Sequence, residues 1–247
     1  MDVSLSDSEK IRYDRQIRIQ NWGLEKQIKL KKSKVAVIGV GGLGSPISIY
    51  LAAAGVGKII LVDSEKFELS NLNRQIIAST CDLNRFKAEA AAEKLKKLNP
   101  EINVVYNTAL LDENNINGII GGCDVIVDAL DNWGTRFLLN RFCVSKNIPL
   151  VHGGVTGWGG QTFTVLPRRG PCLECVFKGV GEVEGGFPVV GVTPGIIGLI
   201  EALEVIKLLT GLGKPLYDKM LVFDGLETSF EYVDIKRNLK CEVCGEG

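Results

Sequence analysis

A glycine-rich segment that follows an apolar run constrains the fold of this chain more than any other feature. Residues 34–39 are apolar and rich in β-branched side chains, residues 39–44 read Gly-Val-Gly-Gly-Leu-Gly, and residues 42–54 have the composition of a helix. A second apolar run, residues 58–63, ends in Asp63. A G-x-G-x-x-G motif between a strand and a helix, with an acid ending the next strand, predicts a βαβ unit that binds a nucleotide.

The glycines of this motif, Gly39, Gly41, Gly42 and Gly44, let the backbone approach a phosphate because they carry no Cβ atom. The N-terminus of the following helix offers unpaired N–H groups to negative charge, and Asp63 can accept hydrogen bonds from ribose hydroxyls. The alternative interpretation is a glycine turn that serves only strand–helix packing. From the motif alone, NAD is the default nucleotide.

The chain continues to alternate between strands and helices up to residue 153. Strands are predicted at residues 102–107, 124–129 and 149–153, and helices at residues 87–98, 112–118 and 133–146. This alternation predicts a Rossmann-like, doubly wound α/β fold with a mostly parallel sheet. Residues 6–32 mix many charges with large apolar side chains and predict one or two amphipathic N-terminal helices.

The pattern changes after residue 153. Residues 160–166 alternate as a half-buried antiparallel strand does, and residues 171–191 are rich in glycine and proline. Residues 193–210 predict a core helix with Thr193 as the N-cap and Pro194 at the first helical position. Two further strands, residues 220–224 and 229–235, should extend the sheet at its C-terminal side.

The charge balance argues against partners that attract a basic surface. The chain has 29 Lys and Arg against 29 Asp and Glu, so it has no net positive field for nucleic acid or anionic lipid. No apolar run reaches the roughly 20 residues that a membrane helix requires, and residues 1–10 lack a signal-peptide pattern. We therefore expect a cytoplasmic protein with no nucleic-acid or membrane partner.

Four of the seven cysteines form two Cys-x-x-Cys pairs, Cys172 with Cys175 and Cys241 with Cys244. Two such pairs are typical of a tetrahedral Cys₄ zinc site, whereas two disulfides would conflict with a reducing compartment. We expect structural Zn²⁺ that fastens the glycine-rich segment to the C-terminus. Of the other cysteines, Cys123 and Cys143 should be buried packing residues, and Cys81 lies in a loop near the expected chemistry.

Polar side chains after Asp63 favour ATP over NAD. Ser70, Asn71 and Arg74 follow the second strand, Lys87 begins the next helix, and Asp131 with Asn132 follows a later strand. A triphosphate needs cations, and a carboxylate beside it could hold Mg²⁺. Taken singly, Arg74 and Lys87 could be solvated charges and Asp131 a helix N-cap. Together they should surround one crevice at the sheet edge.

Several motifs, taken in chain order, carry a specific resemblance. They are R-Y-D-R-Q at 12–16, V-I-G-V-G-G-L-G-S at 37–45, L-A-A-A-G-V-G at 51–57, S-N-L-N-R-Q at 70–75, D-A-L-D-N at 128–132 and the paired cysteines. Over nearly its whole length the chain resembles the MoeB/ThiF/HesA family of adenylyltransferases, relatives of the ubiquitin-activating enzymes. The resemblance implies ATP- and Mg²⁺-dependent adenylation of the C-terminal glycine carboxylate of a small ubiquitin-like sulfur-carrier protein, by a homodimer.

The resemblance also implies roles for individual residues. Gly42 and Asp63 would contact the nucleotide, Asn71, Arg74 and Lys87 would hold the phosphates, and Asp131 with Asn132 would close the metal side. Arg15 would reach into the site of the neighbouring subunit. We expect one domain over residues 1–247, divided into N-terminal helices at 1–32, a nucleotide-binding half at 33–155, and a half at 156–247 that binds the carrier and zinc.

Some family members carry a cysteine that receives the activated carrier, and the resemblance places Phe187 about there. Residues 177–194 contain no cysteine, so we expect the reaction to stop at the acyl-adenylate. Another protein, such as a cysteine desulfurase or rhodanese, would then supply sulfur. Residues 179–186 have the composition of a mobile lid or of an ordinary connection. Two alternatives remain: a tRNA-modifying dehydratase of the same superfamily, and a non-catalytic partner subunit that only binds the carrier.

Overall fold

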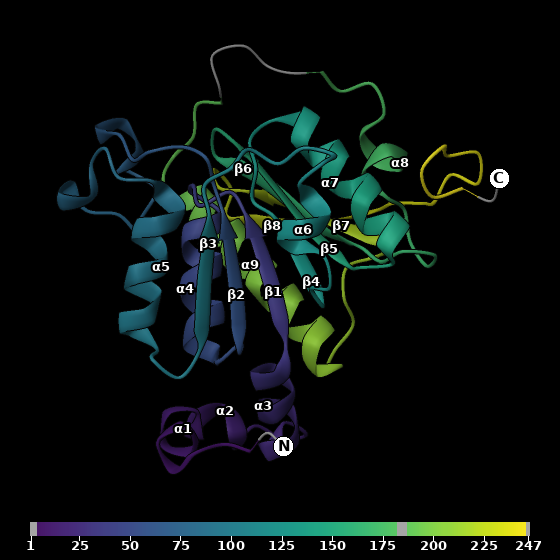
Figure 1. Cartoon of the computed structure of the whole chain (residues 1–247). Helices are drawn as coiled ribbons and strands as arrows, with labels where there is room; N and C mark the ends of the chain where they lie inside the picture. Colours follow the sequence, from purple (N-terminus) through teal and green to yellow (C-terminus); the bar gives the residue numbers. More distant parts are fainter. Residues whose placement is uncertain (1–3, 182–186, 246–247) are drawn as a thin grey trace.

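The computed structural model describes residues 4–181 and 187–245, so residues 182–186, most of the segment with the composition of a mobile lid or of an ordinary connection, lie outside the described residues. One eight-stranded sheet runs through the described chain in the order β3-β2-β1-β4-β5-β6-β7-β8. Helices cover both of its faces, and the three N-terminal helices lie beyond one end of it (Figure 1).

Five neighbouring strands form the parallel part of the sheet: β1 (Lys34–Ile38), β2 (Lys58–Val62), β3 (Asn103–Asn107), β4 (Val125–Asp128) and β5 (Leu150–Thr156). The central strands β1, β2 and β4 are apolar and buried at nearly every position because helices pack on both faces. Their carboxyl ends meet at one edge, which is where doubly wound sheets bind ligands.

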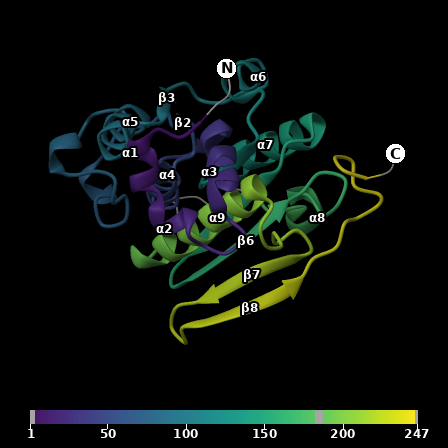
Figure 2. The same cartoon turned by 90° about the horizontal axis from the view of Figure 1, so that it is seen from below.

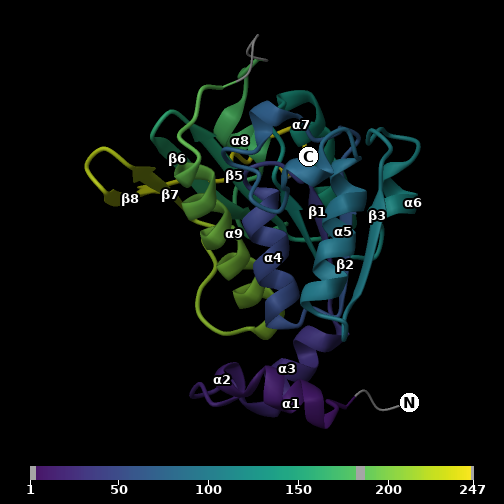
Figure 3. The same ribbon diagram turned by 90° about the vertical axis from the view of Figure 1, so that its left-hand side faces the viewer.

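The helices form two layers. On one face, α4 (Gly44–Ala54) lies between α5 (Lys87–Leu98) and α9 (Val192–Thr210), as Figure 3 shows. The other face is covered by α6 (Ile116–Ile120), α7 (Trp133–Lys146) and α8 (Leu173–Phe177). Short 3₁₀ turns at Leu69–Asn71 and Thr80–Asp82 shape the connection from β2 to α5.

Three antiparallel strands extend the sheet: β6 (Gly159–Val165), β7 (Lys219–Asp224) and β8 (Ser229–Asp234). Figure 2 shows the β7–β8 hairpin projecting from the body of the molecule. The predicted α/β class is confirmed, with its mostly parallel sheet and antiparallel C-terminal extension. No helix of the described residues is long and apolar enough to cross a bilayer.

The N-terminal segment forms three short helices, α1 (Asp7–Arg12), α2 (Asp14–Ile17) and α3 (Gly23–Lys32), where one or two were predicted. Side chains from the R-Y-D-R-Q motif attach them to the body. The Tyr13 hydroxyl accepts a hydrogen bond from Asn99 Nδ2 at 2.8 Å, and Gln16 Nε2 donates to the Ala54 carbonyl at 3.0 Å. These contacts hold α2 against the C-terminal end of α4.

Three helix boundaries differ from the prediction. Helix α4 begins at Gly44 instead of residue 42, and α6 lies at Ile116–Ile120 instead of residues 112–118. Helix α9 begins at Val192, so Thr193 is inside the helix and is not its N-cap. The cause is a turn that precedes the helix, in which the Thr193 N–H donates to the Val190 carbonyl at 2.9 Å.

Gly44→Ala should destabilise the protein by at least about 2 kcal/mol, because a Cβ atom at Gly44 would lie 2.0 Å from the Gly39 carbonyl oxygen and force the backbone apart. The matched control is Gly41→Ala, whose Cβ would lie 3.7 Å from its nearest neighbour, Gln75 Nε2. Urea unfolding without nucleotide measures both. Equal losses of stability in the two variants would contradict this explanation.

Candidate active site

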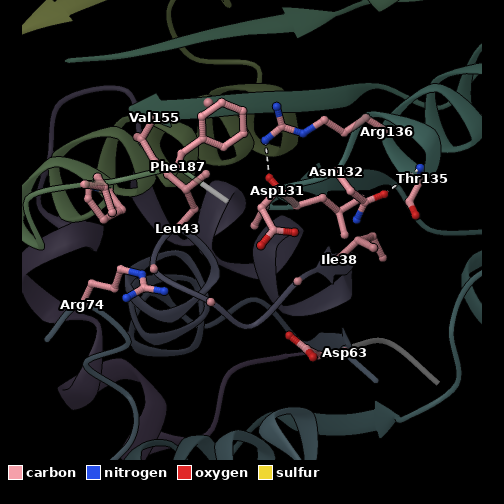
Figure 4. A pocket seen from close by; sticks show the side chains of 18 of the residues that line it. Ile38, Leu43, Asp63, Arg74, Asp131, Asn132, Thr135, Arg136, Val155 and Phe187 are labelled. Atoms are coloured by element: carbon pink, nitrogen blue, oxygen red, sulfur yellow. Dashed lines mark hydrogen bonds between the residues drawn. The ribbon is translucent and has the colours of Figure 1, made fainter. Parts of the chain in front are cut away.

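A cleft of about 850 Å³ opens at the carboxyl ends of β1, β2 and β4. Its lining includes Asp63, Arg74, Lys87, Asp131 and Asn132, together with Gly39, Gly41 and Gly42 of the glycine motif. Figure 4 shows Asp63, Arg74 and Asp131 in this same pocket. The structure therefore brings most of the predicted site residues to one place.

The glycines are required for different steric reasons. Gly39 has a φ of +92°, and a Cβ atom there would lie 2.5 Å from the Ala129 carbonyl oxygen. Gly42 packs against Pro194 of α9, 3.1 Å from the position of its missing Cβ. Gly41 has no described neighbour within 3.7 Å of that position. The loop thus leaves open space at Gly41, beside the N-terminus of α4, where a phosphate fits.

Asp63 is held by the backbone of both neighbouring loops. Its Oδ2 accepts from the Val40 N–H and its Oδ1 from the Glu65 N–H, each at 2.8 Å. Burial nevertheless raises the pKa of Asp63 above its ordinary value, against the lowering effect of these two donors and of Lys87. Each carboxylate oxygen keeps a further lone pair that can accept from a ribose hydroxyl.

The two predicted phosphate cations are fixed differently. Arg74 is half-buried, and its Nη1 donates to the Ser70 carbonyl at 3.0 Å and to Asn73 Oδ1 at 2.9 Å. Lys87 is the first residue of α5, and its side chain is 5% exposed. Its Nζ lies 2.6 Å from Oε2 of Glu65, whose side chain is 69% exposed. An arriving phosphate can therefore replace Glu65 as the partner of Lys87.

Asp131 is exposed and directs its carboxylate into the cleft (Figure 4). The N-cap of α7 is its neighbour Asn132, whose Oδ1 accepts from the Thr135 N–H at 2.9 Å. Capping thus occupies Asn132, although it lines the cleft, and leaves Asp131 available for a cation.

Four predicted site residues lie outside the cleft lining. Gly44 packs against Gly39, Ser70 is exposed, and Asn71 uses its side-chain Oδ1 to accept from the Glu68 N–H at 3.1 Å. Arg15 is exposed on α2, beyond the end of the sheet opposite the cleft (Figure 1). In a single chain, Arg15 and the cleft are therefore far apart.

Several polar residues of the cleft lining were not predicted as site residues, among them Gln75 and Arg136. Gln75 ends the S-N-L-N-R-Q motif, and its buried Oε1 has no hydrogen-bond partner among the described residues. Arg136 is buried in the first turn of α7, on the helix that Asn132 caps. Its place one helical turn after Asn132 is the sequence signal that could have indicated it.

Behind the cleft lies a buried group of titratable residues, Asp128, Arg136, His152 and Glu201. His152 Nδ1 is 2.7 Å from Asp128 Oδ2, and Arg136 Nε is 3.5 Å from Asp128 Oδ1. Burial opposes ionisation of Asp128, but Arg136 and His152 outweigh it and lower the pKa of Asp128. Burial raises the pKa of Glu201 well above its ordinary value, and the charge of Asp128 adds to that rise.

Glu201→Gln should alter stability more at pH 7 than at pH 4. As pH rises above the ordinary value of 4.5, the unfolded chain ionises at Glu201 while the folded chain stays neutral, so the wild type loses stability. Glutamine does not titrate. The difference in unfolding free energy between variant and wild type, measured in urea, should therefore grow in favour of the variant with pH. A difference that stays constant with pH would show that Glu201 is ionised in the folded chain.

The four cysteines of the two pairs come together beside α8. All their Sγ atoms lie within 4.8 Å of one another, with 3.9 Å between Cys172 and Cys175, 3.7 Å between Cys172 and Cys241, and 3.3 Å between Cys175 and Cys244. A disulfide needs about 2.05 Å, whereas tetrahedral zinc with bonds of about 2.3 Å separates its sulfurs by about 3.8 Å. The set fits zinc. Cys123 and Cys143 are buried and Cys81 is exposed.

Residues 13–243 match the ThiF family. This chain belongs to the ThiF family. The SAMP-activating enzyme E1 of Haloferax volcanii is 42% identical over 253 residues, which cover 100% of this chain and 93% of the relative. The molybdopterin-synthase adenylyltransferase of Escherichia coli is 38% identical over 250 residues, which cover 99% of this chain and 100% of the relative. The match confirms the family indicated by the sequence motifs.

A solved structure shares the fold of this ThiF-family chain. The crystal structure of E. coli MccB with ATP aligns with a TM-score of 0.85 and 26% identity, covering 97% of this chain and 75% of that chain. In the present ThiF-family chain, Phe187 is 38% exposed and lines the cleft near Pro188 and Val189. An apolar ring therefore occupies the position at which a cysteine nucleophile was considered.

Proposed function

We propose that this chain is an ATP- and Mg²⁺-dependent adenylyltransferase that activates the C-terminal glycine carboxylate of a small ubiquitin-like sulfur-carrier protein. The observation that carries the proposal is one cleft that combines the glycine loop with Asp63, Arg74, Lys87 and Asp131. The named relatives support it, since one is a SAMP-activating E1 and the other a molybdopterin-synthase adenylyltransferase.

The cleft is shaped for an extended glycine tail as well as a nucleotide. Beside Asp131 it continues along β5 and β6, where Gly154, Gly159 and Gly160 contribute to its lining. Residues without side chains let another backbone approach closely. A Gly-Gly tail entering there would bring its carboxylate toward the phosphates.

The reaction follows from charge and alignment. The tail carboxylate is ionised at neutral pH, so it attacks the α-phosphorus without a general base; a carboxylate O–P bond forms, the P–O bond to the leaving group breaks, and pyrophosphate leaves. Asp63 would orient the ribose, while Arg74 and Lys87 would neutralise charge on the phosphates. Asp131 would hold Mg²⁺, which when bound supplies positive charge to the phosphate oxygens.

We infer that the site is completed by a second copy of the chain. Arg15 lies too far from the cleft of its own chain to act there, so it would serve the neighbouring subunit of a homodimer. Mixing an Arg15→Ala chain with an Asp131→Ala chain should restore up to about a quarter of wild-type activity, because one hybrid site in a mixed dimer has both residues. Neither variant alone should be active. A mixture that stays inactive would mean that Arg15 does not act across the dimer, and an active Arg15→Ala chain would place Arg15 outside the reaction.

The remaining assignments also belong to this proposal. Residues 1–32 would supply the helices of the dimer contact, residues 33–155 the nucleotide half, and residues 156–247 the half for the carrier and zinc. The protein would act in the cytoplasm, with sulfur supplied by a cysteine desulfurase or rhodanese after the acyl-adenylate forms. Position 187 holds phenylalanine instead of cysteine, which supports a reaction that stops at the acyl-adenylate before another protein supplies sulfur.

The decisive experiment is ATP–pyrophosphate exchange by the purified chain. The assay contains ATP, Mg²⁺, labelled pyrophosphate and either a Gly-Gly-tailed carrier, the same carrier without its last glycine, or tRNA. Exchange only with the intact carrier supports the proposal. Consumption of ATP that depends on tRNA would favour the dehydratase, and no exchange with any carrier, despite carrier binding, would favour a non-catalytic partner subunit.

A further inference from the structure

We propose that Arg136 is a positioning residue that holds Asp131 in place for the adenylation reaction, with Asp128 balancing its charge. The inference rests on the proposed function and adds a residue to it. Arg136 is 6% exposed, lines the cleft and points toward the Asp131 loop (Figure 4).

The guanidinium joins two walls of the cleft. Arg136 Nη2 donates to the Leu130 carbonyl and, at 2.9 Å, to the Gly153 carbonyl. Leu130 directly precedes Asp131 in the loop after β4, and Gly153 lies on β5, directly before the cleft residue Gly154. One side chain therefore fixes the distance between the loop that carries Asp131 and the strand beside the expected tail.

Asp128 holds the same peptide unit from the other side. Its Oδ1 accepts from the Leu130 N–H at 3.1 Å, while its Oδ2 is 2.7 Å from His152 Nδ1. Both backbone groups of Leu130 are thus bonded to buried side chains. With its preceding residue restrained in this way, Asp131 has little freedom in its backbone, although its side chain is exposed.

Charge balance decides between positioning and direct phosphate binding. Arg136 and Asp128 form a buried pair of opposite charges, and the ring of Trp133 lies 5.1 Å from the Arg136 guanidinium carbon. Glu201 is fully buried beside Gly153, and neither of its carboxyl oxygens has a hydrogen-bond partner among the described residues. A second buried carboxylate without a partner would be costly, so Glu201 is neutral. The Asp128 carboxylate alone then balances the positive charge of Arg136. Arg136 therefore has no net charge left with which to attract a phosphate.

Arg136→Lys tests the inference, because a single ammonium group cannot reproduce the planar fork that reaches both carbonyls. In pyrophosphate exchange we expect kcat to fall by about 10²-fold, the effect of a displacement of about 1 Å, while KM for ATP changes by less than about threefold. Asp63, Arg74 and Lys87, which would bind ATP, do not contact Arg136 in the described hydrogen bonds and ion pairs.

The matched control is Arg141→Lys, the same substitution on the exposed side of α7. It should keep wild-type kcat. Glu201→Gln should also keep kcat within about twofold, because glutamine resembles the neutral acid. Asp128→Asn should lower kcat as Arg136→Lys does, since it leaves the charge of the Arg136 guanidinium uncompensated. If Asp128→Asn does not fold, Arg136→Lys alone tests the inference.

Hydrogen exchange gives a readout that does not need activity. Backbone amides of residues 129–132 should exchange at least about tenfold faster in Arg136→Lys than in wild type or Arg141→Lys, with the rest of the sheet unchanged. Unchanged exchange in this loop, or an unchanged kcat, overturns the positioning role. If the wild type itself shows no carrier-dependent pyrophosphate exchange, the proposed function fails, and hydrogen exchange still decides what Arg136 does.

Discussion

Cys244→Ser should lower the unfolding free energy by at least about 4 kcal/mol, the scale expected when a structural metal site loses a ligand. Cys244 is 7% exposed, and its Sγ lies 3.3 Å from that of Cys175. The cluster connects α8 to the segment after β8, two parts of the chain separated by 69 residues at that pair. Without the ion, the C-terminal segment would lose its main connection to the body.

Three measurements check the zinc prediction. Zinc content should be one ion per chain in wild type and in Cys81→Ser, which changes an exposed cysteine outside the cluster, and near zero in Cys244→Ser. Urea unfolding should show the decrease in unfolding free energy only in Cys244→Ser. A chelator should bring the wild type to the stability of that variant. A wild type whose stability is indifferent to chelation would contradict a structural zinc site.

Arg74→Ala and Lys87→Ala should each lower carrier-dependent pyrophosphate exchange by about 10²-fold, or about 3 kcal/mol of transition-state stabilisation. Both side chains line the cleft, and neutralising charge on the phosphates is most of the catalysis that this reaction needs. For Lys87 the loss is increased because Glu65 would remain beside the phosphates without its partner.

The matched control for Lys87 is Lys97→Ala, which removes an exposed lysine from the same helix. It should leave the exchange rate unchanged. Thermal unfolding should confirm that all three variants are folded. If Arg74→Ala and Lys87→Ala exchange at the wild-type rate, the phosphates are bound elsewhere and the site assignment is wrong.

The residue pattern within single helices and strands was sufficient to predict much of the fold. Helices at residues 87–98 and 133–146 were predicted with the bounds that α5 and α7 have, because apolar periodicity and capping residues act within one element. The start of α9 was misplaced at Thr193, since the turn before it depends on backbone hydrogen bonds that no residue type specifies.

Some residues of the candidate site could be predicted from the sequence, and others could not. Asp63, Arg74, Lys87 and Asp131 follow the ends of parallel strands, so topology alone could predict that they converge. The group behind the cleft could not be predicted, because Asp128, Arg136, His152 and Glu201 come from four elements whose side chains meet only after packing. The spacing of residues in the sequence does not indicate which side chains of different elements come into contact.

The ion pair between Glu65 and Lys87 makes any anion that binds at Lys87 compete with a carboxylate of the protein itself. Any anion that binds Lys87 must first compete with a carboxylate that is tethered a hydrogen-bond length away and is therefore present at high effective concentration. Under the proposed site assignment, a weak, monovalent anion would lose this competition, whereas a polyphosphate would gain contacts with Arg74 and the glycine loop at the same time. Selectivity for highly charged nucleotides thus begins with an internal competitor.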